Sequence, residues 1–216
     1  MQRLIVEGND GWALTQLCES NALPWPEGFT KKTIGKFVVP AGGYDKISGL
    51  VSAALLEAGL TNIGIVVDAD DAGPEARWQA MRIVLEPFFS NNMLDALAPA
   101  PEGIVLKEPG RPVVGIWIMP DNAGNGYLEH FLAHLVDSEE QLWQHTDQTV
   151  KDLAGRDFCR FKPVRQQKAM LHTWLAWQEE PGRPFGTAMQ AGYLNAKVAA
   201  VQPFLNWMQQ TFRLGS

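Results

Sequence analysis

The segment from residue 62 to residue 67 constrains the fold more than any other part of this chain. Its sequence, NIGIVV, is apolar almost throughout and lacks the polar alternation of a strand that has one face in water. Such a run is typical of a parallel strand covered on both faces. Because parallel strands are joined by crossover segments, we expect an α/β fold with a mainly parallel central sheet flanked by helices.

The pattern around this run supports the same fold class. Strand-like apolar segments alternate with segments whose apolar residues recur at helical spacing, which indicates right-handed βαβ units. The expected strands are residues 3–6, 35–40, 62–67 and 113–119, with an edge-strand candidate at 103–107. The expected helices are residues 10–19, 45–58, 75–89, 127–136, 141–153 and 166–179, with one or two more in 189–212.

The composition shifts after about residue 137, where strand-like segments end and helical ones continue. We therefore expect two parts: an α/β domain at residues 1–136 and a helical C-terminal extension at residues 137–216. Short connections and the abundance of tryptophan, eight in all, predict that the extension packs on the sheet as one unit with it.

Composition narrows the class of protein. With 46% hydrophobic and 19% charged residues, the chain reads as an ordinary globular protein. No apolar run approaches the roughly 18 to 20 residues of a membrane helix, and the first residues do not resemble a signal peptide, so we expect a cytoplasmic protein without a membrane partner. Cys18 and Cys159 are expected to be reduced. A net charge of −6 argues against a protein coated in nucleic acid but permits a local basic surface.

Two of the expected strands end in acidic residues. Glu7 follows the first strand, and Asp68 and Asp70 follow the strand at 62–67. Ligands bind at the carboxyl ends of parallel strands, and carboxylates are suitable ligands for Mg²⁺. Asp68 and Asp70 are two residues apart, which on an extended backbone points both side chains the same way. Asp71 is better explained as a cap of the helix that begins near Pro74.

Further candidates lie later in the chain. Asp121 follows the strand at 113–119, and Glu129 lies in the first turn of the next expected helix, where it is either a metal ligand or a complement to the helix dipole. Between residues 151 and 168, six lysines and arginines stand against two aspartates, which is either a phosphate-contacting patch or an ion-paired, solvated face. His172, close by, is more simply a structural residue.

These acids resemble a known family. The segments Val6-Glu7-Gly8 and DADDAG at residues 68–73 look like the glutamate and the DxD motif of the Toprim (topoisomerase-primase) domain, over about residues 1–136. The family's glutamate falls on Glu7 and its paired aspartates on Asp68 and Asp70. Some Toprim enzymes carry a third aspartate at the position that corresponds to Ala72 here, and its absence weakens the interpretation as a topoisomerase. The zinc-ribbon cysteines and the basic core of primases are also absent from the sequence.

The overcoming-lysogenisation-defect nucleases are the better match within the Toprim family. They carry a further acid on a later helix, which could be Glu129, and a lysine beyond the Toprim core, which could be Lys168 and could stabilise charge on a scissile phosphate. The resemblance therefore implies hydrolysis of phosphodiester bonds in DNA or RNA that depends on Mg²⁺ or Mn²⁺. It assigns catalysis to Glu7, Asp68, Asp70 and Lys168, and metal binding to Glu7, Asp68, Asp70, Asp121 and Glu129.

Two other functions remain open from the sequence. The chain has no GxxxxGK[ST] phosphate loop, so an active enzyme could require a separate ATPase or regulatory partner. A Toprim-like protein could also bind a metal or nucleotide without catalysis, as a regulatory or interaction protein. In a pure interaction protein, Asp68 and Asp70 would merely cap turns. The sequence decides neither between DNA and RNA nor the oligomeric state.

Overall fold

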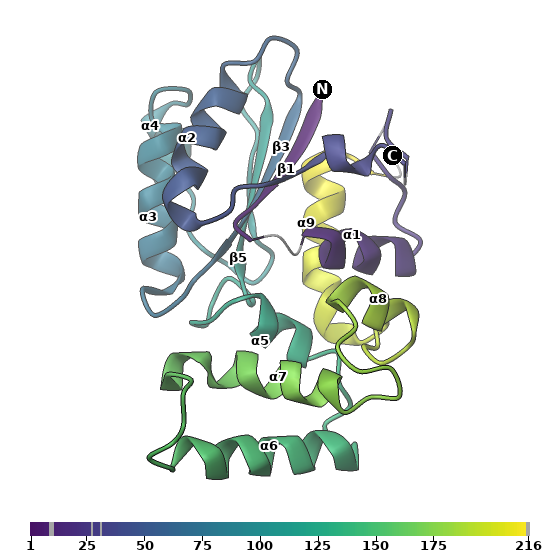
Figure 1. The fold of residues 1–216 in the computed structure, drawn as a ribbon. Coiled ribbons are helices and arrows are strands. Elements are labelled where there is room, and N and C mark those ends of the chain that lie inside the picture. The colour runs from purple at the N-terminus through teal and green to yellow at the C-terminus, as the bar shows by residue number, and fades with distance from the viewer. Residues whose placement is uncertain (9–10, 27, 31, 215–216) are drawn as a thin grey trace.

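A five-stranded, mainly parallel sheet forms the centre of the protein. The computed structural model describes residues 1–8, 11–26, 28–30 and 32–214 (Figure 1). The strand order is β2-β1-β3-β5-β4, and only β4 runs antiparallel to its neighbour. The strands are β1 (Gln2–Val6), β2 (Val38–Pro40), β3 (Asn62–Asp68), β4 (Ile104–Leu106) and β5 (Val113–Met119). The α/β class expected from the sequence is confirmed.

Helices cover both faces of the sheet and continue beyond its lower end. The α-helices are α1 (Gly11–Ser20), α2 (Tyr44–Leu55), α3 (Gly73–Leu85), α4 (Asn91–Asp95), α5 (Leu128–Ala133), α6 (Gln141–Ala154), α7 (Gln166–Ala176), α8 (Phe185–Gln190) and α9 (Gln202–Phe212). Short 3-10 helices lie at Ile34–Lys36, Pro163–Arg165 and Ala199–Val201. Helices α2 and α3 lie on one face and α1 and α9 on the other, whereas α6 and α7 lie beyond the carboxyl ends of the strands (Figure 1).

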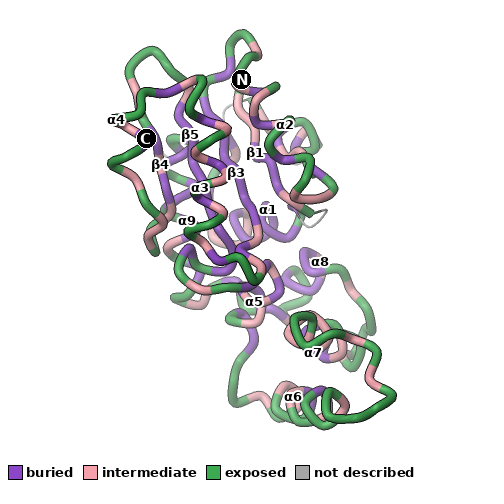
Figure 2. Tube along the Cα trace, turned by 90° about the vertical axis from the view of Figure 1, so that its left-hand side faces the viewer, coloured by how far each residue is buried: buried purple, intermediate pink, exposed green. Residues whose placement is uncertain are grey.

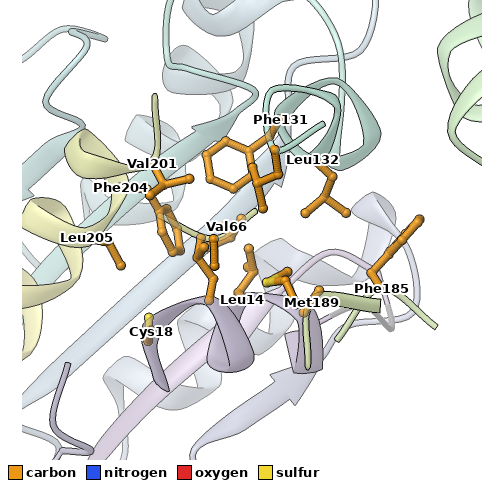
Figure 3. Close-up of a cluster of buried hydrophobic side chains, with 14 of the residues drawn as sticks. Leu14, Cys18, Val66, Phe131, Leu132, Phe185, Met189, Val201, Phe204 and Leu205 are labelled. Carbon is orange, nitrogen blue, oxygen red and sulfur yellow. The ribbon is translucent and has the colours of Figure 1, made fainter. Parts of the chain in front are cut away.

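The C-terminal extension shares a hydrophobic core with the α/β part. Val66 of β3 and Leu14 of α1 belong to the same buried cluster as Phe131, Phe185 and Phe204, which come from α5, α8 and α9 (Figure 3). A second cluster, around Ile65 and Ile116, lies under α2 and α3. Both sides of β3 and β5 are therefore buried, as their continuous apolar sequences predict (Figure 2).

Two glycines let α9 lie close against the sheet. Gly64 and Gly115 are paired neighbours on β3 and β5. A β-carbon at Gly64 would come 2.7 Å from the Phe212 ring, and one at Gly115 would come 2.6 Å from Thr211 Cγ2. Without side chains at these two positions, the last turns of α9 pack directly on the strand backbones.

Most expected elements are present, with differences at their ends. The strand expected at 35–40 is shorter, because residues 34–36 form a 3-10 turn and only Val38–Pro40 pair with β1. Within the range 189–212 expected to be helical, the helical residues are mainly those of α9 and the 3-10 turn before it, whereas α8 lies largely before that range, at Phe185–Gln190. Residue 10, where the first helix was expected to begin, lies outside the described residues. Within the described ranges, none of the helices combines the length and the hydropathy that crossing a membrane would require.

Candidate functional site

The carboxyl ends of β1 and β3 enclose a pocket at the point where the strand order reverses. From β1 the chain passes over one face of the sheet through α1 to β2, then over the opposite face through α2 to β3, on the other side of β1. In open α/β sheets this reversal leaves a crevice that binds ligands. The pocket there has a volume of about 170 Å³. Its polar or charged lining residues are Glu7, Asp68, Glu129, Arg165 and Lys168.

Glu7 is fixed in this pocket by the backbone around it. Its Oε2 accepts a hydrogen bond from the Asp68 N–H at 3.0 Å, and its carbonyl accepts from the N–H groups of Gly42 and Gly43 at 3.0 Å each. Burial raises the pKa of the Glu7 carboxyl, and the negative charge of Asp70 adds to the rise. The glutamate therefore carries its negative charge at an energetic cost that a nearby cation would relieve.

Asp68 is the last residue of β3, and its carboxylate also points into the pocket. Its Oδ1 accepts the N–H of Leu128, the first residue of α5, at 3.1 Å. Burial first, and then the charge of Glu7, raise the pKa of Asp68 from 3.8 to about 7. Two neighbouring strand ends thus bring together two buried carboxyl groups with raised pKa values, which is typical of functional sites.

Asp70 points differently from the sequence-based prediction. Its φ is +49°, in the left-handed region, and its backbone pairs with Gly126, so the extended geometry expected for the DxD segment is wrong. The Asp70 carboxylate accepts a hydrogen bond from Arg77 at 2.7 Å, and the Arg77 guanidinium lies 3.7 Å from the centre of the Tyr44 ring. Asp70 consequently lines a second pocket next to the first, although its charge still reaches Glu7 and Asp68.

The predicted cap at Asp71 is also wrong. The N-cap position of α3 is occupied by Ala72, and no side chain caps the helix there. The chain turns tightly after the bridge at Asp70, which starts the helix one residue later than the cap would require, with Pro74 in its first turn. Asp71 is exposed, and its carbonyl accepts a hydrogen bond from the Asn125 side chain at 3.2 Å.

Glu129 and Lys168 meet in the pocket that also holds Glu7 and Asp68. Glu129 lies in the first turn of α5 with its side chain only 5% exposed, and Lys168 Nζ of α7 is 2.5 Å from its Oε1. Lys168 itself is 44% exposed, so the pair sits at the pocket wall rather than in the core. His172 Nε2 is 4.0 Å from the same oxygen.

Asp121 lies elsewhere. Its Oδ1 accepts the N–H groups of Ala123 and Gly124, at 3.1 and 2.7 Å, and so closes the turn after β5. It lines a separate pocket of about 180 Å³, together with Trp117 and Phe131. The structure does not bring Asp121 to the pocket that holds Glu7 and Asp68.

Four residues selected from the sequence therefore share one pocket: Glu7, Asp68, Glu129 and Lys168. The side chains as they stand do not form a complete metal cage, because the described residues contain no group of three or more His, Cys, Asp or Glu positioned to hold an ion.

Two arginines at the site were not predicted from the sequence: Arg165 was counted only as part of a basic segment, and Arg77 was overlooked. A signal for Arg77 was its position in the first turns of the helix that follows the acidic segment, seven residues after Asp70.

Comparisons with known proteins place the chain in a family. Neither the curated proteins nor the solved structures contain a match to it. A family model described as "Protein of unknown function (DUF3226)" matches residues 1–213, almost the whole sequence, so the chain belongs to that family.

Proposed function

We propose that this protein hydrolyses phosphodiester bonds of nucleic acid with Mg²⁺ or Mn²⁺, in the pocket between β1 and β3, and that its α/β part is Toprim-like. The observation that carries the proposal is the pairing of Glu7 and Asp68. They come from adjacent strand ends, burial raises the pKa of both, the charge of Glu7 further raises that of Asp68, and both line a pocket with Arg165 and Lys168. Paired acids beside cations suit a metal ion and a phosphate together.

The residues present fit Mg²⁺ in an open site. This ion keeps several waters and usually takes one or two protein carboxylates plus phosphate oxygens, so Glu7 and Asp68 provide a sufficient set. Asp70 would join them by giving up its ion pair with Arg77 to bind the metal, and Glu129 by giving up its ion pair with Lys168. When bound, the metal would polarise a phosphoryl oxygen and lower the pKa of a coordinated water.

Arg165, in the turn before α7, and Lys168 of α7 are placed to contact the phosphate of the substrate. Arg165 makes no ion pair with an acid in the described parts of the chain, and it lies 5.6 Å from the centre of the Tyr127 ring. It is thus available to a phosphate group, and a guanidinium can contact two phosphate oxygens at once. Lys168 would neutralise charge on the same phosphate once it leaves Glu129.

Cleavage of supercoiled plasmid and of labelled single strands, with Mg²⁺ or Mn²⁺ and with EDTA, tests this proposal. Glu7→Gln and Asp68→Asn are expected to abolish both cleavage and metal binding measured by calorimetry. The matched control is Asp121→Asn, which keeps the turn-closing acceptor and lies outside the pocket, and it should cleave like the parent protein. Cleavage that survives in both pocket variants would show that the nuclease activity lies elsewhere or belongs to a contaminant.

A second candidate function is a non-catalytic regulatory or interaction protein that binds a metal or nucleotide. The observation in its favour is that two acids at or beside the site are already paired with the protein's own cations, Asp70 with Arg77 and Glu129 with Lys168. This alternative predicts that calorimetry detects Mg²⁺ or nucleotide binding that Asp68→Asn removes, while no substrate is cleaved under any condition.

A further inference from the structure

The connection between α6 and α7 is the most basic exposed segment next to the pocket. We call residues 155–165 the α6–α7 loop. It carries Arg156, Arg160, Lys162 and Arg165 against the single acid Asp157, in a protein whose net charge is −6. All four cations are exposed, and none of them forms an ion pair with an acid within the described ranges. No ion pair therefore neutralises these cations, and together they form a suitable surface for a phosphate backbone.

Aromatic side chains are interleaved with these cations. The Phe158 side chain is 68% exposed, although phenylalanine is usually buried, and Phe161 is partly buried nearby in the sequence. The sequence RDFCRFKPVR at 156–165 therefore alternates charge with rings. Cations that follow a backbone and rings that stack on bases are the two components of surfaces that bind single-stranded nucleic acid.

The loop leads directly into the pocket. At its C-terminal end, the Tyr127 hydroxyl donates a hydrogen bond to the Val164 carbonyl, which anchors the loop beside the start of α5. The next residue, Arg165, lines the pocket with Glu7 and Asp68, and Lys168 follows one turn into α7. Figure 1 shows α6 and α7 beyond the sheet, joined by this loop, and Figure 2 shows how exposed α6 is. A chain bound along the loop would thus reach the acids.

From this juxtaposition we propose that the α6–α7 loop is a docking surface for single-stranded nucleic acid, and that single strands are the substrate class of the pocket. This inference rests on the proposed function. Arg156, Arg160 and Lys162 contact successive phosphates, and Phe158 stacks on an unpaired base. A duplex keeps its bases inside the helix and can engage only the cations, so it binds more weakly.

The test is binding of the full chain, in EDTA, to a fluorescein-labelled single-stranded DNA, the corresponding RNA, and a blunt DNA duplex of equal length, followed by fluorescence anisotropy. EDTA prevents turnover, so binding is measured separately from cleavage. We expect both single strands to bind more tightly than the duplex. Phe158→Ala should weaken single-strand binding about 5-fold to 150-fold, the range of one lost stacking contact, and leave duplex binding unchanged. Phe158→Tyr should retain affinity.

Matched controls distinguish the effect of the α6–α7 loop from the effect of removing any exposed apolar or charged side chain. Leu56→Ala removes a side chain that is 76% exposed at the opposite end of the sheet, and it should bind like the parent protein. For a single strand, the logarithm of the binding constant falls linearly with the logarithm of the salt concentration, and Arg160→Ala should reduce the magnitude of this slope by about 0.7. Arg111→Ala, on the exposed turn before β5, should leave the slope unchanged.

Equal affinity for single strands and duplex, or a Phe158→Ala variant with unchanged single-strand binding, would overturn the inference while leaving metal-dependent cleavage intact. Conversely, single-strand binding that depends on Phe158, in a protein that never cleaves, would overturn the proposed function and retain the docking surface. Absence of binding to all three probes would overturn the inference as well.

Discussion

At the scale of single residues, Asp68 couples the candidate site to pH. In the unfolded chain the Asp68 carboxyl loses its proton near its ordinary pKa of 3.8, whereas in the folded protein it keeps that proton up to about pH 7. Between these values the folded state binds more protons than the unfolded state, so the free energy of unfolding falls as pH rises. Asp68 alone should remove about 2–3 kcal/mol of stability between about pH 5 and pH 8.

Urea denaturation in EDTA at these two pH values measures the effect. Asp68→Asn keeps an acceptor for the Leu128 N–H but cannot ionise, so its stability should change much less between the two pH values. Because metal binding competes with protons for the carboxylates, Mg²⁺ should stabilise the parent protein more at the higher pH. A parent and a variant with the same pH dependence would show that Asp68 does not titrate in this range.

The pair of Glu129 and Lys168 makes a prediction about stability and charge. Lys168→Met leaves the Glu129 carboxylate, 5% exposed, without the cation that lies 2.5 Å away. Removing one partner of a buried pair is destabilising, but water reaches Lys168, so we expect a loss of about 1–2 kcal/mol in the free energy of unfolding. Lys162→Met, which removes an exposed cation of the α6–α7 loop, should change stability little in the same urea experiment. Equal effects of the two substitutions would contradict a specific role for the pair.

At the scale of elements, the close contact of α9 with the sheet depends on glycines. Gly115→Ala would place a methyl group against Thr211, so α9 or β5 must move. Such overpacking should lower the free energy of unfolding by about 1–3 kcal/mol. Gly49→Ala is the matched control, because Gly49 lies within α2 with open space around it, and alanine there should stabilise by up to about 1 kcal/mol. Urea midpoints that shift in the same direction for both variants would refute this account.

The sequence predicts elements well where one physical signal dominates. β3 and β5 are continuous apolar runs, and both are found as expected, because burial on two faces requires such a run. The position of Glu7 and Asp68 follows from the same logic, since parallel strands end at one edge. The direction of Asp70 does not follow, because it depends on a left-handed backbone that pairs with Gly126, more than 50 residues later. Long-range pairing of this kind leaves no local signature in the chain.

At the scale of the whole molecule, the division at residue 136 does not separate two cores. The cluster that contains Leu4 and Val66 is completed by Phe204 and Trp207 of α9, and the indole N–H of Trp207 donates to the Ile104 carbonyl of β4 at 3.2 Å. Asn62 of β3 likewise donates to the Thr211 carbonyl at 2.7 Å. The extension therefore covers, together with α1, one face of the sheet, and without α9 much of that face would be open to water.

This arrangement predicts a single cooperative unfolding transition for the full chain. Residues 1–136 alone lack α9, so the apolar side chains of β3 and β5 on that face lose much of their cover even though α1 remains, and we expect no cooperative transition in urea and strong binding of an apolar dye. Intrinsic tryptophan fluorescence and far-ultraviolet circular dichroism should give coincident transitions for the full chain, because Trp117 of the sheet and Trp207 of α9 lie in one core, with ring centres 5.8 Å apart. A fragment of residues 1–136 that unfolds cooperatively would show instead that the α/β part is an independent domain, and that α9 covers a face which can remain exposed.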